Sequence, residues 1–331
     1  MRRAVLSVVL VAAVTAPLVS CKDSQAGSPS PAPPSSSDTA TTTTDPSSSA
    51  ASTTPTSTTT TRTTSSSKPQ NPAPPPAPGG FPTPASTGVP AGTAFRKTVG
   101  EYVASTAGEV IDSWHITGAL IIKARNVTIR NTQIDDSVYE LGGSFTITDS
   151  LVGPATCGAK IAMPMAIGEQ NYTAIRVHVR GHEDGFRAGG PNVVVKDSYY
   201  LGCVKDDIAH ADGIQDYPQT TNVIVEHNTF DQSKLPYGYT APIFVHSTAT
   251  SGARIVNNLA IGGTYAVYLM PGIGSWTVTG NRVVAGESDF GAYEAEGKCG
   301  AIGTWADNDI VKIDSSYRIV ATVVDNAPCG K

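Results

Sequence analysis

The chain of 331 residues has little of what several large protein classes need. Its 23 Lys and Arg residues are outnumbered by 28 Asp and Glu residues, which gives a net charge of −5. Charge-driven binding to nucleic acid or to an anionic membrane surface requires a basic excess, so we expect no nucleic-acid partner. Aromatic residues make up only 7% of the chain, so the core must consist mainly of Val, Ile, Ala and Gly.

Two further absences argue against a membrane-spanning protein and against a zinc-binding protein. No uninterrupted apolar run reaches the roughly 20 residues that a membrane-spanning helix needs. The five cysteines form no Cys-x-x-Cys pair, which argues against a structural zinc site. Only 15% of residues are charged, whereas 24 are Pro and 32 are Gly, a mixture that indicates a long non-globular part.

The N-terminus has the pattern of an export signal. Residues 1–20 combine two arginines, a short apolar stretch and a small-residue cleavage site. The tetrad Leu18-Val19-Ser20-Cys21 resembles the lipobox of bacterial lipoproteins, in which the cysteine is acylated, for example with palmitate, and becomes the first mature residue. This resemblance implies a lipid anchor on Cys21 that holds the protein at the extracytoplasmic face of the cell membrane.

The composition changes sharply within the mature chain. Residues 21–87 consist almost entirely of Ser, Thr, Pro, Ala and Gly. Such a segment has too little apolar surface to fold, so we predict that it forms a disordered linker. We expect the folded part to begin near Phe81 and the repetitive domain to span residues 88–331. Five of the basic and three of the acidic residues precede Gly88, which leaves the domain a net charge of −7.

The domain contains four cysteines, Cys157, Cys203, Cys299 and Cys329. An even number in an exported chain predicts two disulfide bonds, for which three pairings exist. Their positions favour Cys157 with Cys203 and Cys299 with Cys329.

Short strand-like segments recur along the domain. One set alternates Val, Ile or Phe with polar residues and ends in Asn or Asp, which tolerates the left-handed conformation of a tight turn. Its members are residues 126–131, 144–149, 192–197, 222–228, 254–258 and 276–281. No helical period separates them, so each predicts one turn of an all-β solenoid. A β-sandwich is the alternative, but it does not account for the shared Asn or Asp endings.

A second set lies between the first and aligns without gaps: residues 185–189, 213–217, 242–246, 266–270 and 301–305. The alignment predicts a core stack of Phe186, Ile214, Ile243, Val267 and Ile302. It also predicts an outward row of Arg187, Gln215, Phe244 and Tyr268. The two sets together resemble the single-stranded, right-handed parallel β-helix of the pectate-lyase-like superfamily.

Two successive repeats share a His-x-Asp-Gly motif, His182 with Asp184 and His210 with Asp212. In register, equivalent residues of adjacent parallel strands lie about 4.8 Å apart. Two carboxyl groups this close do not ionise independently, which raises the pKa of one and makes the pair suited to acid and base catalysis. The alternative is structural, since Asp-Gly also caps turns, with Gly at positive φ and Asp accepting N–H groups.

Asp184 and Asp212 match the places of the catalytic aspartates in polygalacturonases, which these motifs resemble. The chain lacks their Gly-His-Gly and Arg-x-Lys elements and the Trp-Ile-Asp-His and Arg-x-Pro-x-x-Arg elements of pectate lyases. Another β-elimination would need a cation to neutralise a uronate carboxylate, for which Arg187 or a bound Ca²⁺ would serve. His182, His210 or Tyr217 would then transfer protons.

Metal binding is left open by the residues. Asp206 and Asp207 would add hard oxygen ligands for Ca²⁺ to those of Asp184 and Asp212. The set His182, His210 and Asp212 would instead suit a transition metal, and a site without metal is the third alternative.

Aromatic and polar residues of the second set suggest sugar binding. We expect Gln215, Tyr217, Phe244, His246 and Tyr268, with Trp305 beside them, to line a groove where rings stack on sugars. The alternative is that a loop covers these rings as a small satellite core. We expect His115 and His227 to be structural.

The sequence therefore predicts a monomeric, lipid-anchored, extracytoplasmic protein that acts on a polysaccharide or cell-wall glycan. The first hypothesis is an enzyme, a polysaccharide lyase or glycoside hydrolase, with Asp184, Asp212, His182, His210 and Arg187 as catalytic residues. The second is a non-catalytic carbohydrate-binding or adhesive β-helix that uses the same face.

Overall fold

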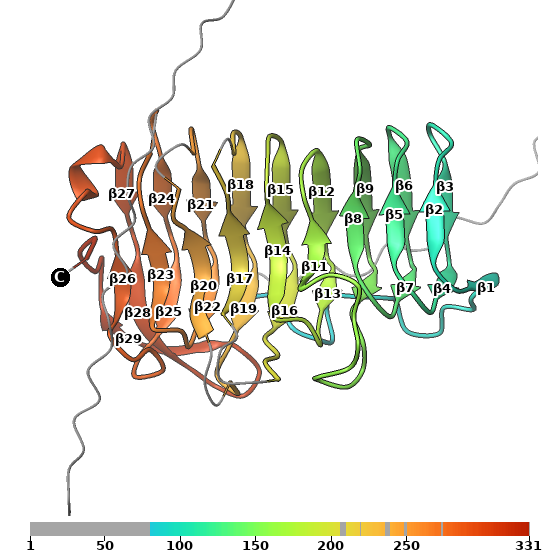
Figure 1. The fold of residues 1–331 in the computed structure, drawn as a ribbon. Coiled ribbons are helices and arrows are strands. Elements are labelled where there is room, and N and C mark those ends of the chain that lie inside the picture. The colour runs from blue at the N-terminus through green and yellow to red at the C-terminus, as the bar shows by residue number, and fades with distance from the viewer. Residues whose placement is uncertain are drawn as a thin grey trace, which may run out of the picture. The chain divides into compact units, whose positions relative to one another are not determined.

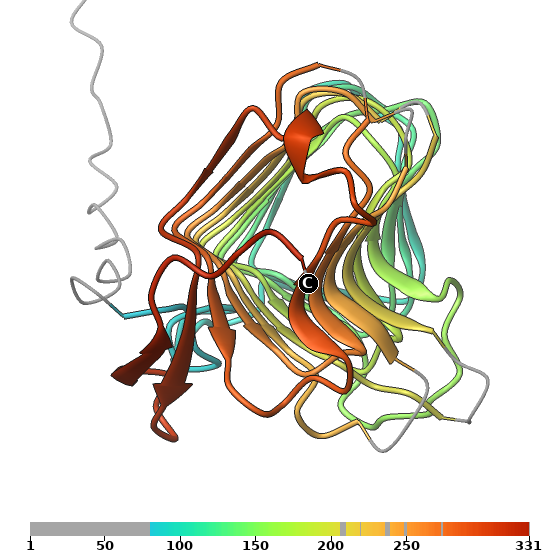
Figure 2. The ribbon, with the colours of Figure 1, turned by 90° about the vertical axis from the view of Figure 1, so that its left-hand side faces the viewer.

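The computed structural model describes residues 80–205, 210–218, 220–235, 239–247, 250–272 and 274–330. All of them belong to the compact unit Lys68–Lys331. They form a parallel β-helix, in which successive strands pass in turn to three different sheets and each coil stacks on the one before (Figure 1). Seen along the stack, the strands of each sheet lie one behind another (Figure 2). The predicted all-β solenoid is confirmed.

Sheet A contains eleven strands: β1 (Lys97–Val99), β4 (Trp114–Ile116), β7 (Gln133–Ile134), β10 (Leu151–Val152), β13 (His178–Val179), β16 (Tyr199–Leu201), β19 (Thr229–Asp231), β22 (Leu259–Ile261), β25 (Arg282–Val284), β28 (Asp309–Ile313) and β29 (Ile319–Val324). Its strands are parallel except for the last pair, β28 and β29. This antiparallel pair ends the sheet.

Sheet B contains nine strands: β2 (Tyr102–Ala104), β5 (Leu120–Ile122), β8 (Val138–Glu140), β11 (Met165–Gly168), β14 (Asp184–Ala188), β17 (Ala211–Asp216), β20 (Tyr239–Val245), β23 (Tyr265–Leu269) and β26 (Gly291–Glu294). Sheet C also contains nine: β3 (Val110–Asp112), β6 (Val127–Arg130), β9 (Phe145–Thr148), β12 (Tyr172–Ile175), β15 (Val193–Lys196), β18 (Val223–Glu226), β21 (Arg254–Val256), β24 (Thr277–Thr279) and β27 (Thr304–Ala306). One short 3₁₀ helix, η1 (Cys299–Ala301), precedes β27.

Left-handed residues occur at many of the corners that flank the strands of sheet C. Asn126, Asn192 and Asn222 have positive φ just before their strands, and Asn131 and Asp149 have positive φ just after theirs. Asn and Asp adopt this conformation more readily than other side chains. The predicted role of these residues as turn formers is therefore confirmed for the first coils.

In the later coils, an asparagine stands directly after the left-handed residue that follows the strand of sheet C. His227, Asn257, Gly280 and Asp307 take the left-handed position there. The residue after each is a fully buried asparagine, and we call this set the asparagine ladder: Asn228, Asn258, Asn281 and Asn308. Each Nδ2 of the first three donates to the Oδ1 of the next asparagine, at 2.9 to 3.0 Å. The ladder satisfies buried polar groups that a turn inside the coil would otherwise leave unpaired.

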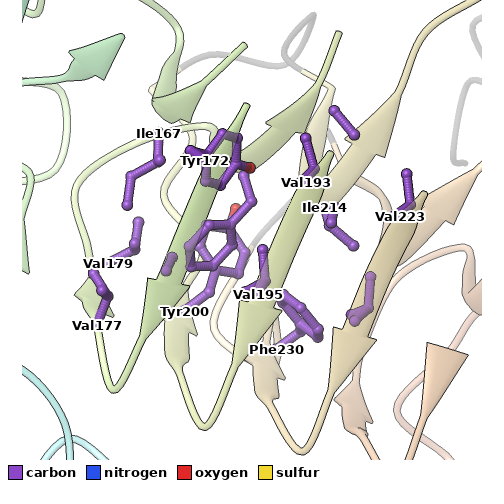
Figure 3. Close-up of a cluster of buried hydrophobic side chains, with 14 of the residues drawn as sticks. Ile167, Tyr172, Val177, Val179, Val193, Val195, Tyr200, Ile214, Val223 and Phe230 are labelled. Carbon is purple, nitrogen blue, oxygen red and sulfur yellow. The ribbon is translucent and has the colours of Figure 1, made fainter. Parts of the chain in front are cut away.

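The core fills the space between the three sheets with alternate residues of their strands. Figure 3 shows its middle part, with Ile167 and Ile214 from sheet B, Tyr172, Val193, Val195 and Val223 from sheet C, and Val179, Tyr200 and Phe230 from sheet A. Phe186, Ile214, Ile243 and Val267 follow one another in register, as the repeat alignment predicted. These four side chains are fully buried.

The prediction that Ile302 is the fifth residue of this core stack is wrong. Val267 pairs with Tyr293 of β26, not with Ile302. Residues 301–305 instead contain the start of β27 in sheet C, where Trp305 pairs with Val278. Trp305 is half-buried, packs edge-on against Tyr293 and donates its Nε1–H to the carbonyl of Ala327. It therefore lies away from the outward row of sheet B.

The segment of residues 80–96, which precedes β1, runs along the outer face of sheet A. Gly80 and Pro82 accept hydrogen bonds from His227 and Thr229, and Phe81 packs with Leu259. Further along the segment, Gly88 bonds to the carbonyl of Arg176 and Arg96 to that of Ser113. The segment thus passes back across several coils before it enters the first one.

Both predicted disulfide bonds are confirmed. Cys157 is joined to Cys203 and Cys299 to Cys329, with Cα atoms 5.6 and 5.7 Å apart. Two disulfides in one chain indicate an extracytoplasmic protein.

Candidate functional site

The two His-x-Asp-Gly motifs lie side by side in sheet B. Strands β14 and β17 pair in parallel with Phe186 opposite Ile214 and Arg187 opposite Gln215. Asp184 and Asp212 stand two residues before that pair, at the start of each strand. The backbone N–H of Asp212 donates to Oδ1 of Asp184 at 3.3 Å, and that of Ala241 donates to Oδ1 of Asp212 at 3.1 Å. Each carboxyl group therefore caps the strand of the next coil.

Close packing explains the glycine after each aspartate. A Cβ on Gly185 would lie 2.4 Å from the carbonyl oxygen of Gly213 and 2.7 Å from the ring of Tyr200. A Cβ on Gly213 would lie 2.2 Å from the carbonyl oxygen of Pro242 and 2.6 Å from the ring of Phe230. Neither glycine has positive φ, so the turn-based reason considered from sequence does not apply. The two glycines therefore leave room for the buried rings of Tyr200 and Phe230.

Arg187 is the centre of a polar network on the outer face of sheet B. Its Nη2 donates to Oδ2 of Asp184 at 3.0 Å, and its Nη1 lies 3.5 Å from Oε1 of Glu169. Its guanidinium group lies 5.1 Å from the ring centre of Tyr217, whose hydroxyl donates to Gln215 at 3.1 Å. Four predicted residues are therefore brought together, and Glu169 is a member that the sequence did not indicate.

Burial controls the acidity of the two aspartates. Asp184 is 5% and Asp212 1% exposed. Burial raises the pKa of Asp184 to about 6, although Arg187 favours its charged form. Burial and the charge of Asp184 together raise the pKa of Asp212 well above its ordinary value. Asp212 also has a buried Oδ2 without a hydrogen-bond partner among the described residues. Asp184 is thus the member of the pair that ionises first.

The two histidines of the motifs differ in accessibility. His182 is fully buried, faces the carbonyl groups of Pro164, Asp136 and Met163, and has its pKa lowered by burial. His210 is exposed, and its Nδ1 lies 3.4 Å from the hydroxyl of Thr240. Of the two, only His210 therefore has access to a ligand from solution.

A group of rings continues the outer face of sheet B toward the C-terminal coils. We call Phe244, His246, Tyr265, Tyr268 and Phe290 the aromatic band. Adjacent ring centres lie 4.5 to 5.8 Å apart, and His246 stacks on Phe244. Phe290 is 61% exposed, and Phe244 and Tyr268 are partly exposed. The band is therefore an open surface and not a covered satellite core.

Two glutamates border the aromatic band and were not predicted. Glu294 of β26 lies opposite Tyr268 in the register. Oε1 of Glu296 accepts hydrogen bonds from the Tyr268 hydroxyl at 2.7 Å and from Nε2 of His246 at 2.8 Å. These bonds lower the pKa of Glu296 and keep it ionised. The misaligned last repeat concealed both residues, because β26, which ends at Glu294 two residues before Glu296, reads Gly-Ala-Tyr-Glu.

A cavity of about 440 Å³ lies at the corner between sheets A and B, beside the carboxyl pair. It is lined by the loop that contains Lys160 and Met163, together with Glu183 and Lys205. The Cys157–Cys203 disulfide and the bond from the His210 N–H to Glu183 lie along its edge. Glu183 immediately precedes Asp184 in the chain, but neither Asp184 nor Asp212 is among the residues that line the cavity.

The predicted metal ligands cannot all be placed. Asp206 and Asp207 lie outside the described residues, as does Cys21. Within the part of the chain that the structure describes, no three His, Cys, Asp or Glu side chains are grouped closely enough to hold a metal ion. In the same part, no helix has the length and apolarity to cross a membrane.

Comparison with known proteins adds no relative. No protein-family model matches the chain, and no curated protein or solved structure matches it either.

Proposed function

We propose that the protein is an extracytoplasmic enzyme that cleaves a polysaccharide bound along the outer face of sheet B. We further propose that it belongs to the pectate-lyase-like superfamily and is held at the membrane by a lipid on Cys21. The superfamily is inferred from the form of the repeats and the three-sheet coil. The anchor is inferred from the tetrad that ends in Cys21.

The observation that carries the enzymatic proposal is the coupled pair Asp184 and Asp212 beside Arg187. A carboxyl group with a pKa of about 6 exchanges its proton near neutral pH, which is what a general acid or base requires. As the general acid, Asp184 would donate its proton to the glycosidic oxygen while the bond from that oxygen to the sugar carbon breaks. Arg187 would hold the Asp184 carboxylate in place, and Asp212 would influence its ionisation through their close contact.

The neighbouring groups fit the same task. In a β-elimination two proton transfers are needed, and the exposed His210 would serve the second. The aromatic band would hold sugar units that extend from the cleavage point, because apolar sugar faces stack on aromatic rings while hydroxyl groups bond to their polar edges.

A second candidate is a binding protein without catalysis. It is favoured by the near-complete burial of Asp184 and Asp212 and by their hydrogen bonds to the N–H groups of the next coil. Such bonds give both carboxyl groups a sufficient structural role. In that case the aromatic band alone would provide the function.

The experiment compares three variants of the full chain on a panel of neutral, uronic-acid and amino-sugar polysaccharides. Unsaturated products are followed by ultraviolet absorbance and hydrolysis by new reducing ends. We expect Asp184→Asn and Asp212→Asn to lower the cleavage rate by about 10²–10⁴-fold, the contribution of a positioned acid or base.

Asp216→Asn is the matched control. Asp216 is also buried and accepts the N–H groups of His246 and Ser247, but it stands four residues beyond Asp212. Equal losses in all three variants, with circular dichroism unchanged, would mean that capping and not catalysis was removed. Retained binding to a glycan without any cleavage by the wild type would establish the second candidate.

A further inference from the structure

The charges on the outer face of sheet B restrict which glycan fits it. Arg187 is the cation nearest the carboxyl pair, and its guanidinium group already contacts both Asp184 and Glu169. Its side chain is only 15% exposed. A uronate carboxylate that approached this largely buried guanidinium group would meet the repulsion of both protein carboxylates. The site therefore disfavours an acidic polysaccharide.

The aromatic band combines rings with negative charge. The ionised Glu296 bonds to Tyr268 and His246, and Glu294 occupies the next outward position beside Tyr268. Lys298 and His246 are the cationic groups that influence Glu296. His246 is already in contact with its carboxylate, and Lys298 forms no ion pair with it. The other carboxylate oxygen of Glu296, Oε2, has no hydrogen-bond or ion-pair partner among the described residues.

Rings beside carboxylates are a setting that attracts ammonium groups. An ammonium group is drawn to the face of Tyr or Phe by its quadrupole and to a carboxylate by charge. A neutral sugar uses the rings alone and gains nothing from the negative charge. The domain as a whole carries −7 beyond Gly88, which repels a polyanion and attracts a polycation from a distance.

We propose that the glycan bound by the aromatic band is an amino-sugar polymer with free amino groups. This proposal rests on the proposed function, since it names the substrate class of that same face. It restricts the proposed cleavage to hydrolysis, because an amino sugar has no carboxylate to activate the proton that β-elimination removes. A pyranose ring stacks on Tyr268 or Phe244, and its ammonium substituent lies against the face of a neighbouring ring and the carboxylate of Glu296. The next sugar units extend over Tyr265 and Phe290.

The test uses two oligosaccharides that differ in a single group. A hexamer of β-1,4-linked glucosamine is compared with the fully N-acetylated hexamer, which has the same backbone but no charge. Binding to the full chain is measured by calorimetry at about pH 6, where the ordinary carboxylates are ionised. We expect about tenfold tighter binding of the free amine, and this preference should weaken as salt is added.

Glu296→Gln should reduce that preference to about threefold or less while leaving the affinity for the N-acetylated hexamer unchanged. Glu226→Gln is the matched control, because it removes one negative charge from the outer face of sheet C, where Glu226 pairs with Lys196. It should keep the full preference. Loss of the preference for the free amine in both variants would show that only the net charge of the protein matters. This result would overturn the proposal that Glu296 binds the amino group.

The remaining outcomes separate this proposal from the function on which it rests. Equal binding of the two hexamers, or tighter binding of an oligogalacturonate, overturns the amino-sugar proposal and leaves a carbohydrate-active protein. Binding of a lysine-rich peptide with the affinity of the glucosamine hexamer also overturns it, since the ammonium group alone would then be recognised. Failure to bind any glycan rejects the proposed function itself.

Discussion

Asp184 shows how one side chain serves both the coil and the proposed chemistry. One of its oxygens accepts the N–H of Asp212 in the next coil, and the other bonds to Arg187. Burial favours the neutral carboxyl, whereas the guanidinium group favours the carboxylate. The balance between these influences places the titration of Asp184 near neutral pH.

This balance predicts how stability changes with pH. In the unfolded chain Asp184 titrates near its ordinary pKa of about 3.9, and in the folded chain near 6. Between these values the folded state binds more protons, so its stability falls as the pH rises from about 4 to about 6 and then stays constant. Asp184→Asn lacks this loss. We expect the free energy of unfolding of the variant, relative to wild type, to rise by about 2–3 kcal/mol from pH 4 to pH 7.

Urea unfolding at the two pH values measures this difference. Asp216, whose pKa burial also raises, is common to both proteins and cancels in the comparison. Asp212 does not cancel, because the variant lacks the Asp184 charge that raises its pKa, and this coupling adds to the expected difference with the same sign. A difference between variant and wild type that is independent of pH would mean that Asp184 is ionised as easily as an exposed aspartate.

The adjacency of Asp184 and Asp212 could be predicted because a parallel register repeats one motif at one position. The partners of Arg187 could not. Glu169 comes from the preceding coil, after a loop whose length follows no repeat. Nor could the sequence distinguish His182 from His210, since the same motif leaves one histidine buried and the other exposed.

At the scale of the element, polar stacks inside the corners define the coils. The asparagine ladder runs through four successive corners between sheets C and A. The corners before it use hydroxyl groups, with Ser150 accepting from the N–H of Thr132 and Ser198 from that of Val177. Each such side chain links two coils, so the loss of one affects both neighbours.

Asn258→Ala tests the ladder. The change removes the Oδ1 that accepts from both the backbone N–H and the Nδ2 of Asn228, so this buried N–H loses its partner, and it removes the Nδ2 that donates to Asn281. We expect a loss of about 2–4 kcal/mol in the free energy of unfolding, measured by urea denaturation. Thr173→Ala, on the outer face of sheet C, should change it by less than about 0.5 kcal/mol. Similar effects of the two changes would show that the asparagine ladder does not contribute specifically to stability.

The elements that sequence alone predicted were those with a strong pattern. Strands β15 and β18 consist of three Val or Ile residues and one charged residue, and each starts after a left-handed asparagine. Strand β26 has neither feature, because its residues Gly-Ala-Tyr-Glu bury only a tyrosine. Sequence alignment of the repeats therefore matches residues 301–305 in place of β26. These residues have the same spacing of apolar residues as the strands of sheet B, but they pair in sheet C.

At the scale of the whole molecule, the lipid anchor proposed for Cys21 can be tested independently of the β-helix. Cys21→Ser should transfer the protein from the detergent-rich to the aqueous phase on detergent phase separation, because the acyl chains would be missing. Cys299→Ser, which removes a disulfide cysteine of the domain, should leave the protein in the detergent phase. A wild-type protein that partitions into water, with an unmodified N-terminal peptide by mass spectrometry, would exclude the lipid.

The path of residues 80–96 has a mechanical consequence. A pull on the chain ahead of Gly80 acts first at the contacts of Gly80, Phe81 and Pro82 with His227, Leu259 and Thr229, well along the stack and not at its first coil. The load must peel this strip from sheet A, past Gly88 and Arg96, before it reaches β1. The strip would therefore yield step by step and shield the first coil from force applied through the N-terminal chain.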